Sequence, residues 1–474
     1  MSNFDLGPLT RESRRPQWVR EHPGAPWAAV GSVCLGAFMG QLDASIVTLT
    51  YPQLQAEFNT GLGSVQWVSL LYLVVLAVLL VPVGRWADSR GRKLLYLYGF
   101  GLFSLASAAC ALAPSLGWLV AGRGFQAVGA ALLQANSVAL VVLSVPRSRV
   151  RTALGFQGAA QALGLALGPT LGGALVDAYG WRSVFWVNVP IGVVAIVTGY
   201  VLLPRSRDLN PGRGKDVAGF VLLAAAIVST LLVLSGLSGM PLPSAVVVGL
   251  CVVAVVTAVL FWRAEGRAVA PLMDTSLLGR GGLGVSLMGA LLAYLLLFAP
   301  LVLYPSIFAT WGMSTTAGGL VLSCLPAGFA LAAVGANAMH LRASNRQRVA
   351  LGAMGVFVCV VANIALWRSP SLVAVLLLLM GAFLGLVIPA NNATVMAAIP
   401  ARAAAVTGGM VNVARALGTA LGIAVAAMGL HVAELHNWVG PQVVLGGLAV
   451  CSIALGATTL SRPTMSGEQH PSTQ

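Results

Sequence analysis

The stretch AQALGLALG, residues 160–168, recurs in the second half of the chain as ARALGTALG, residues 414–422, with seven of nine residues matching. A weaker echo joins ANS at residues 135–137 to ANN at residues 390–392. In each pair the two copies lie an even number of apolar segments apart, so both halves of the chain would insert in a membrane with the same orientation. The repeat predicts two similar helix bundles related by a parallel duplication.

Composition places both halves in a membrane. Of the 474 residues, 58% are hydrophobic and only 8% are charged, and the mean hydropathy is +0.88. A soluble domain carries about 25% charged residues. The apolar runs are continuous, and each is near the roughly 20 residues that cross hydrocarbon as a helix. Because the runs lack the alternation of a β-barrel and lipid offers no partners to open backbone groups, helices are expected.

Hydropathy predicts fourteen spans between Trp27 and Leu460. With a cytoplasmic N-terminus, 23 of the 27 Lys and Arg residues fall on the inner side; the exceptions are Arg123, Arg182, Arg368 and Arg415. This distribution follows the positive-inside rule and places both termini in the cytoplasm. It also accounts for the net charge of +14 without a nucleic-acid partner.

We therefore expect an all-α polytopic membrane protein, monomeric and built from five parts. High use of Ala, Gly and Arg is typical of a GC-rich bacterial genome, which favours a bacterial cell (inner) membrane. The parts are a cytoplasmic segment (1–26), a six-helix bundle (27–203), two inserted transmembrane helices with their loops (204–282), a second six-helix bundle (283–460) and a cytoplasmic tail (461–474).

The first span contains a single acid, Asp43, in LDASIVTLTYP (42–52). An ionised Asp at the bilayer centre costs about 3 kcal/mol on insertion scales. Arg123 in span four is expected at the same depth, about 10 Å below the outer boundary. A nearby Arg favours the ionised carboxylate, whereas burial favours the protonated one, so the pair can form a switchable proton site. A static ion pair is the alternative.

Span five carries glycines at every fourth position, Gly164, Gly168 and Gly172, which share one helix face. This spacing lets another helix approach closely. Pro169, which removes a backbone donor and can bend the helix, lies on the same span, as does Gly173. Ordinary helix packing is the alternative interpretation.

The segment GRWADSRGRK (84–93) is predicted to be a cytoplasmic loop between spans two and three. Gly84 and Gly91 permit a tight turn. Asp88 can pair with Arg92 or with a helix N-terminus, and Lys93 adds to the basic character of the loop. A basic loop that only obeys the topology is the alternative.

With these stretches the chain resembles the major facilitator superfamily, and the 84–93 segment is similar to the family signature between helices two and three. Further stretches resemble the fourteen-span drug/proton antiporter branch of multidrug exporters: LDASIVTLTYP (42–52), RGFQAVGAA (123–131), GLALGPTLGG (164–173), WRSVFWVNVPIG (181–192) and GGMVNVARALGTALG (408–422).

The resemblance implies two six-helix bundles that rock about a central cavity, and proton-driven export of a lipophilic small molecule such as an antibiotic, dye or toxic compound. It implies that Asp43 and Arg123 serve proton coupling, that the 84–93 segment latches the cytoplasmic side, and that the span-five motif seals the interface between the halves. No cofactor is expected, because the proton gradient drives the cycle. The expected partners are the substrate, protons and the bilayer.

Several polar and aromatic residues within the spans are candidates for the cavity. Arg415 has no membrane acid in its own half, and its repeat counterpart is Gln161. It can line the cavity or satisfy a carbonyl. The amides are equally suited to bonding helices together: Gln126, Gln134, Asn136, Gln161, Asn391, Asn392 and Asn412. The aromatic residues are interpreted as interface belt or packing rather than substrate stacking: Trp67, Tyr72, Trp186, Tyr294 and Tyr304.

Other functions fit the sequence less well. The span-five motif argues against proton-coupled uptake, and so does the lack of a charged cavity. A sensor or scaffold would usually carry a soluble output domain. An enzyme or metal site is disfavoured because no predicted span contains a pair of histidines. His431, Glu434 and His436 are interpreted as a solvated outer loop. The later spans contain no carboxylate, which argues against dicationic substrates and against two protons per cycle.

Overall fold

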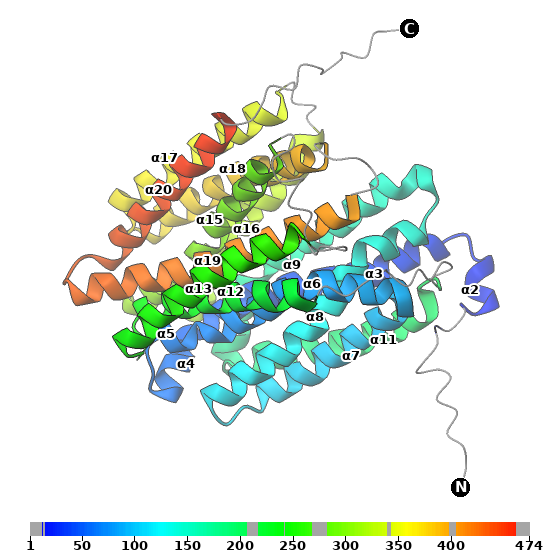
Figure 1. Ribbon diagram of the computed structural model, residues 1–474, viewed down its shortest axis with the longest axis horizontal. Coiled ribbons are helices and arrows are strands. Elements are labelled where there is room, and N and C mark those ends of the chain that lie inside the picture. The colour runs from blue at the N-terminus through cyan, green and yellow to red at the C-terminus, as the bar shows by residue number, and fades with distance from the viewer. Residues whose placement is uncertain are drawn as a thin grey trace.

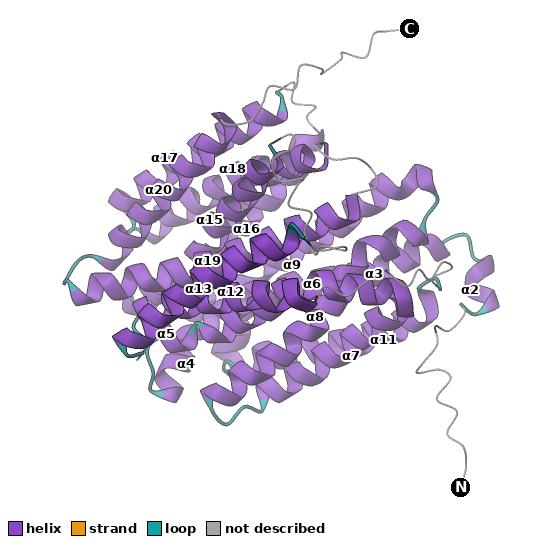
Figure 2. Cartoon of the chain, viewed as in Figure 1, coloured by secondary structure: helices purple, strands orange, loops and turns teal. Residues whose placement is uncertain are grey.

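The computed structural model describes residues 12, 15–205, 217–240, 242–267, 282–338, 343–397 and 404–460. These residues form helices joined by short turns, with no strand among them (Figure 2). Fourteen helical segments are long and apolar enough to cross a membrane, which confirms the predicted number.

The helices fall into two sets separated by an inserted pair. The first set is α2 (Gln17–Glu21), α3 (Ala25–Ile46), η1 (Val47–Thr50), α4 (Tyr51–Phe58), α5 (Leu62–Val65), α6 (Trp67–Arg90), α7 (Arg92–Ala111), α8 (Leu116–Ser144), η2 (Arg147–Arg149), α9 (Val150–Tyr179), α10 (Ser183–Trp186) and α11 (Asn188–Leu202). The inserted pair is α12 (Val217–Leu237) and α13 (Ser244–Glu265). The second set is α15 (Leu283–Thr310), α16 (Thr315–Ala338), α17 (Asn345–Leu366), α18 (Pro370–Ala397), α19 (Ala404–Leu435) and α20 (Gly440–Leu460).

The sequence repeat produces the same helix contact twice. In the N-terminal half α9 packs against α3, and in the C-terminal half α19 packs against α15. Gly164 leaves no room for a Cβ against the α3 backbone, and Gly418 leaves none against the α15 backbone. The repeated glycines therefore hold equivalent helix pairs close together in the two halves.

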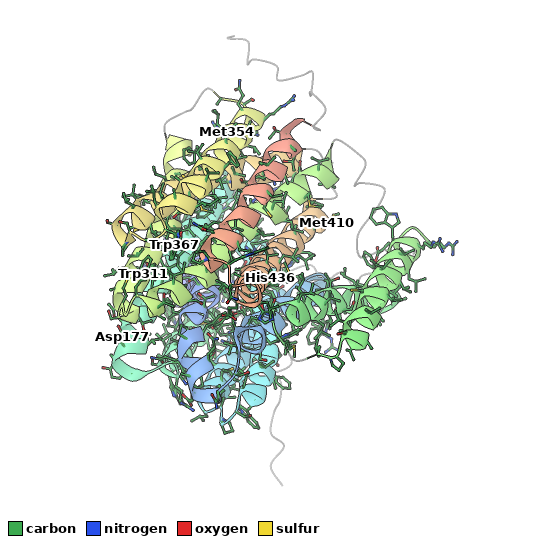
Figure 3. All side chains as sticks on the ribbon, turned by 90° about the vertical axis from the view of Figure 1, so that its left-hand side faces the viewer. Asp177, Trp311, Met354, Trp367, Met410 and His436 are labelled. Atoms are coloured by element: carbon green, nitrogen blue, oxygen red, sulfur yellow. The ribbon has the colours of Figure 1, made fainter. Side chains whose placement is uncertain are left out.

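The two halves lie side by side with their helices roughly parallel, blue to cyan beside yellow to red (Figure 1). They meet where α9 packs against α16 and where α6 packs against α19. The inserted α12 packs on α6 and α19, whereas α13 packs mainly on α12 and is only 6% buried over its apolar window. Figure 3 shows this pair, in green, at the side of the bundle. Because α13 is apolar on all sides and makes few contacts with the rest of the protein, it is suited to face lipid.

Several helices extend further than hydropathy predicts. The first span continues from α3 through α4 to Phe58, which places Glu57 on a membrane-crossing segment, and Asp177 lies near the end of α9. The predicted loop at 84–93 is wrong for most of its length. Helix α6 continues to Arg90, and only Gly91, with φ of +107°, separates it from α7. Hydropathy measures the apolar length, whereas a helix can continue past the hydrocarbon on intact backbone hydrogen bonds.

Candidate functional site

Asp43 is completely enclosed near the middle of the long first span. One carboxylate oxygen accepts a hydrogen bond from Arg123 Nη1 on α8 at 2.7 Å. The other accepts from Gln126 Nε2 on α8 at 2.9 Å and from Asn188 Nδ2 on α11 at 3.1 Å. Because buried charge is costly unless it is paired and hydrogen-bonded, this arrangement explains how the carboxylate is tolerated among apolar helices.

Arg123 is as enclosed as its partner, with 1% of its side chain exposed. Its Nε donates to the carbonyl of Val68 on α6 at 2.8 Å, and its Nη1 also donates to Gln126 Oε1 at 2.5 Å. The guanidinium lies 4.1 Å from the ring centroid of Tyr72, a cation–π geometry. Arg123 thereby links two helices of the N-terminal half, α8 and α6, to the carboxylate on a third, α3.

The ion pair expected between Asp43 and Arg123 is therefore present, but its surroundings differ from the expectation. Gln126, expected in the cavity, instead bonds Asp43, Arg123 and the hydroxyl of Ser107, to which it donates at 2.7 Å. Tyr72, interpreted as belt or packing, covers the guanidinium. Sequence reasoning missed Asn188, although an amide within the apolar WVNVPIG stretch was a usable signal.

The span-five glycines face the helix that carries Asp43. A Cβ at Gly164 would collide with the Phe38 carbonyl, one at Gly168 with Ser45, and one at Gly172 with Ile46, all on α3. The expected close approach of another helix is thus made within the N-terminal half. Only the opposite side of α9 reaches the other half, where Gly173 lies against the Thr315 backbone and the Pro169 carbonyl lies against Gly319.

One end of the interface between the halves is closed by polar contacts of α9 with α16. Asp177 near the C-terminus of α9 accepts from Thr316 N at 2.7 Å, Thr316 Oγ1 at 2.6 Å and Thr315 N at 3.1 Å. The carboxylate thus caps the N-terminus of a helix from the other half. About two helical turns further along the interface, Thr170 and Ser323 share a hydrogen bond of 2.6 Å. Figure 3 views the molecule from this end, with Asp177 labelled.

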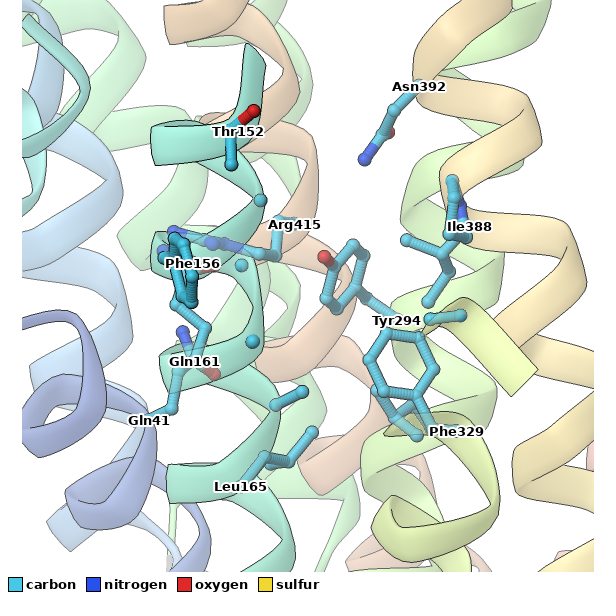
Figure 4. A pocket seen from close by; sticks show the side chains of 17 residues that line it. Gln41, Thr152, Phe156, Gln161, Leu165, Tyr294, Phe329, Ile388, Asn392 and Arg415 are labelled. Carbon is cyan, nitrogen blue, oxygen red and sulfur yellow. The ribbon is translucent and has the colours of Figure 1, made fainter. Parts of the chain in front are cut away.

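A cavity of about 620 Å³ lies between the halves, toward the end that the predicted topology assigns to the cytoplasm. Gln41 and one face of α9 line it from the N-terminal half, and α15, α16, α18 and α19 line it from the other (Figure 4). Most lining side chains are small or apolar, including Phe156, Leu165 and Phe329. A mostly apolar cavity with a few polar groups is the usual form of a small-molecule site.

The candidate cavity residues divide into two groups. Arg415 and its repeat counterpart Gln161 both line the cavity, as does Tyr294, which was interpreted as belt or packing. Arg415 Nη2 also donates to Gln134 Oε1 on α8, so this bond crosses between the halves. Asn392 is a lining residue as well.

The remaining amides do not line this cavity. Asn136 and Asn391 are buried between helices, where their amide nitrogens donate to the carbonyls of Leu132 at 2.7 Å and Ser286 at 2.8 Å. Asn412 is half-buried on α19 outside the lining. Asn391 thus bonds α18 to α15, whereas Asn136 bonds a carbonyl of its own helix, and neither has the expected cavity role in this conformation.

At the end that the predicted topology assigns to the cytoplasm, the turn before α7 receives a carboxylate from the N-terminal segment. Glu12 Oε1 accepts from Lys93 N at 2.8 Å and from Leu94 N at 3.4 Å, which satisfies the start of α7. A Cβ on Gly91 would collide with this carboxylate. Lys93 Nζ donates to the Tyr200 carbonyl at 2.7 Å.

Two predicted members of this region have different outcomes. Gly84 lies inside α6 with open space around it, so it makes no turn. The side chain of Asp88 lies outside the described residues, and its pairing with Arg92 stays a prediction. Sequence reasoning missed Glu12, because a residue so distant along the chain carries no signal of the helix start it meets.

Comparison with known proteins gives concordant similarities. A family model described as Major Facilitator Superfamily matches residues 33–423. Multidrug resistance protein Stp of Mycobacterium tuberculosis is 32% identical over 82% of this chain and 73% of its own length. A methylenomycin A resistance protein of Streptomyces coelicolor is 31% identical over 89% of this chain and 90% of its own. For the uncharacterized MFS-type transporter YvkA of Bacillus subtilis, 33% identical, the match spans 63% of this chain and 66% of the relative.

Solved structures share the architecture at low sequence identity. A D-xylose-proton symporter superposes with a TM-score of 0.64 at 13% identity, over 90% of this chain and 97% of its own. A POT family transporter in complex with 5-aminolevulinic acid superposes with a TM-score of 0.68 at 13% identity, over 91% of this chain and 94% of its own. At such identities the likeness concerns the fold alone.

Proposed function

Because this chain belongs to the major facilitator superfamily of membrane transporters, we propose that it is a proton-coupled antiporter that exports lipophilic small molecules. Its two halves alternate access to the cavity between them. It works as a monomer in a bacterial cell membrane, with both termini in the cytoplasm, and is driven by the proton gradient without a cofactor.

The observation that carries the proposal is the buried Asp43 cluster. Among the described residues, Asp43 is the only carboxylate enclosed in the middle of a membrane-crossing segment; Glu57, Asp177, Glu265 and Glu434 lie near the ends of theirs. An ionisable group inside a membrane bundle is expected to serve an ion or proton pathway. Protonation of Asp43 would cancel its attraction to Arg123, and would change how tightly two other helices, α8 and α11, hold α3.

The two ends of the interface support alternating access. The α9–α16 contact closes one end through Asp177 and through Thr170 with Ser323, while the 620 Å³ cavity lies toward the other. This is the arrangement of an inward-facing state under the predicted topology. Substrate and proton would then each favour one conformation, so that binding of one shifts the population available to the other.

The direction of transport rests on the span-five motif and on the relatives. Stp is named a multidrug resistance protein, another relative a methylenomycin A resistance protein, and a third, from Streptomyces glaucescens, a tetracenomycin C resistance and export protein. Such names favour export of lipophilic compounds here too. The largely apolar lining of the cavity suits the same class of substrate.

The test is dye transport into inside-out membrane vesicles from a pump-deficient host. We expect Asp43→Asn to abolish proton-dependent accumulation while the protein still inserts at normal levels. The control is Glu434→Gln, which neutralises an 81% exposed carboxylate at the C-terminal end of α19 and should transport as the parent does. Undiminished accumulation by the Asp43 variant would overturn the coupling mechanism.

The same vesicles separate export from its alternatives. Proton-coupled uptake would make dye leave inside-out vesicles rather than enter them when a proton gradient is imposed. A non-transporting sensor or scaffold would move none of the dyes in either direction, and would tolerate the loss of Asp43.

A further inference from the structure

The cavity between the halves contains one formal charge among its described lining residues, and that charge is positive. Arg415 is the only ionised side chain there; the other polar side chains are Gln41, Thr152, Gln161, Tyr294 and Asn392. No carboxylate contributes to this lining. A cavity of this composition attracts negative charge and repels positive charge.

Arg415 also lacks an acidic partner. Within the described part of the chain, Asp43 pairs with Arg123, Glu57 with Arg182, and no carboxylate forms an ion pair with Arg415. Its hydrogen bonds go to two neutral groups, the amide oxygen of Gln134 and the hydroxyl of Tyr294. A guanidinium carries five N–H donors, so most of them are left for another acceptor. A half-buried cation without a counter-ion is costly unless a bound group neutralises it.

The neighbours of Arg415 complete a site for one kind of molecule. The Tyr294 hydroxyl points toward the Arg415 side chain, and Phe156 and Phe329 lie on opposite sides of the cavity (Figure 4). The hydroxyl can donate a second hydrogen bond to an anion held by the guanidinium. The two rings offer apolar faces to an aromatic frame.

Building on the proposed export function, we propose that the substrates of this cavity are lipophilic aromatic anions. The anionic group binds Arg415 and Tyr294, and the rings pack against Phe156 or Phe329. The guanidinium keeps donors beside the one that Gln134 uses, so an anion can bind without displacing that amide. Because the Arg415–Gln134 bond joins α19 of one half to α8 of the other, the substrate binds at a residue that also links the halves.

Two dyes with one aromatic frame test the inference. The anion 8-anilinonaphthalene-1-sulfonate and the neutral N-phenyl-1-naphthylamine differ by the sulfonate, and ethidium serves as an aromatic cation. In inside-out vesicles we expect Arg415→Gln to lower accumulation of the sulfonate by about tenfold, as for loss of a charge-assisted hydrogen bond. Accumulation of the neutral dye should change less than about twofold, since it makes no such bond.

The variants separate a substrate contact from a structural role. Arg415→Lys keeps the charge and should retain part of the preference for the sulfonate. Gln134→Ala removes only the bond between the halves, and should leave the ratio of anionic to neutral dye near that of the parent. Arg368→Gln, which removes a cation at the other end of the bundle, is the matched control. An equal loss of both dyes in Arg415→Gln would mean that the residue is structural, and would overturn the proposal.

Binding tests the site independently of transport. Equilibrium dialysis of the sulfonate against purified protein in nanodiscs should show weaker binding to Arg415→Gln than to the parent, by about tenfold. Equal binding to both proteins overturns the anion site even if export of the neutral dye or ethidium stands. Stronger binding by the parent, together with no transport of any dye, would support the site and contradict the export function.

Discussion

The Asp43 carboxylate is held by three side chains, and only one of them follows from the sequence. Arg123 could be predicted because a lone charge in one apolar helix requires an opposite charge in another. Gln126 lies one turn along from Arg123, but residue type alone does not tell a cavity amide from one bonded to a carboxylate. Asn188 depends on how α11 is placed after the break at Val187, which tertiary packing decides.

At this scale the ion pair can be tested as a pair. Arg123→Gln leaves Asp43 buried without its cation, and we expect it to destabilise the protein by about 3–5 kcal/mol. Adding Asp43→Asn should recover much of that loss, because the uncompensated charge is then gone. Thermal unfolding in detergent, followed by tryptophan fluorescence, measures both effects.

Transport by the same variants separates stability from function. The double variant should fold but remain inactive in proton-driven dye transport. Recovery of transport along with stability would show that the pair only supports the structure.

At the scale of elements, α9 combines two contacts that the sequence did not distinguish. The four-residue glycine spacing predicted close approach of a helix, and α3 is that helix. The spacing could not identify the partner helix, because a face of glycines allows close approach of the backbone of any neighbouring helix. The contact with the other half comes instead from Pro169, Gly173 and Asp177 on the opposite side of α9. Asp177 lies beyond the end of the glycine motif at residues 164–173, so the motif did not indicate it.

Two glycines of α9 make a matched pair for stability. A Cβ at Gly164 meets the backbone carbonyl of Phe38, which cannot move aside, so Gly164→Ala should destabilise by about 1–3 kcal/mol. Gly158 has open space around its Cβ position, and Gly158→Ala should be neutral or stabilise by up to roughly 1 kcal/mol through helix propensity. Thermal unfolding compares the two directly, and equal midpoints would contradict the proposed contact with α3.

Asp177 lies at the end of the interface between the halves that the predicted topology places outside, here called the outer end, and its substitution tests what holds this end closed. Asp177→Asn removes the charge from three hydrogen bonds to the start of α16, so the outer end should open more often. In a background without the six native cysteines, a cysteine introduced at Ser323 should react with an external, membrane-impermeant maleimide faster, by up to about tenfold.

The control for this experiment is Glu57→Gln. It breaks an exposed ion pair with Arg182 at 2.8 Å inside the N-terminal half and should leave the labelling rate unchanged. A rate in Asp177→Asn that matches the parent would show that the carboxylate does not hold the outer end closed.

For the whole molecule, the repeat predicted two halves, and the halves are present. The repeat also paired Gln161 with Arg415, and both residues line the cavity between the halves. Which end of the cavity is closed could not be predicted, because alternating states share one sequence and differ in which interhelical contacts are made. The Asp177–Thr316 and Thr170–Ser323 contacts belong to one such state.

The charge moved in one cycle is a property of the whole molecule, and in the proposed mechanism the Asp43 carboxylate sets it. If Asp43 carries one proton inward per exported molecule, export of a neutral dye moves one positive charge inward. Export of a monovalent anion moves the equivalent of two. Each charge contributes about 2.3 kcal/mol per 100 mV of membrane potential. The anionic substrate inferred for Arg415 should therefore respond twice as strongly to the potential, in free energy, as a neutral one.

Valinomycin with potassium, which collapses the potential of energised inside-out vesicles but preserves the pH gradient, measures this difference. The factor by which steady-state accumulation of 8-anilinonaphthalene-1-sulfonate falls should equal the square of the factor for N-phenyl-1-naphthylamine, because two charges rather than one lose their driving energy. Vesicles with Asp43→Asn give the passive distribution of each dye, which is subtracted. Equal factors for the two dyes would contradict exchange of each dye for a single proton, because the anion would then have been exchanged for one proton fewer than the neutral dye.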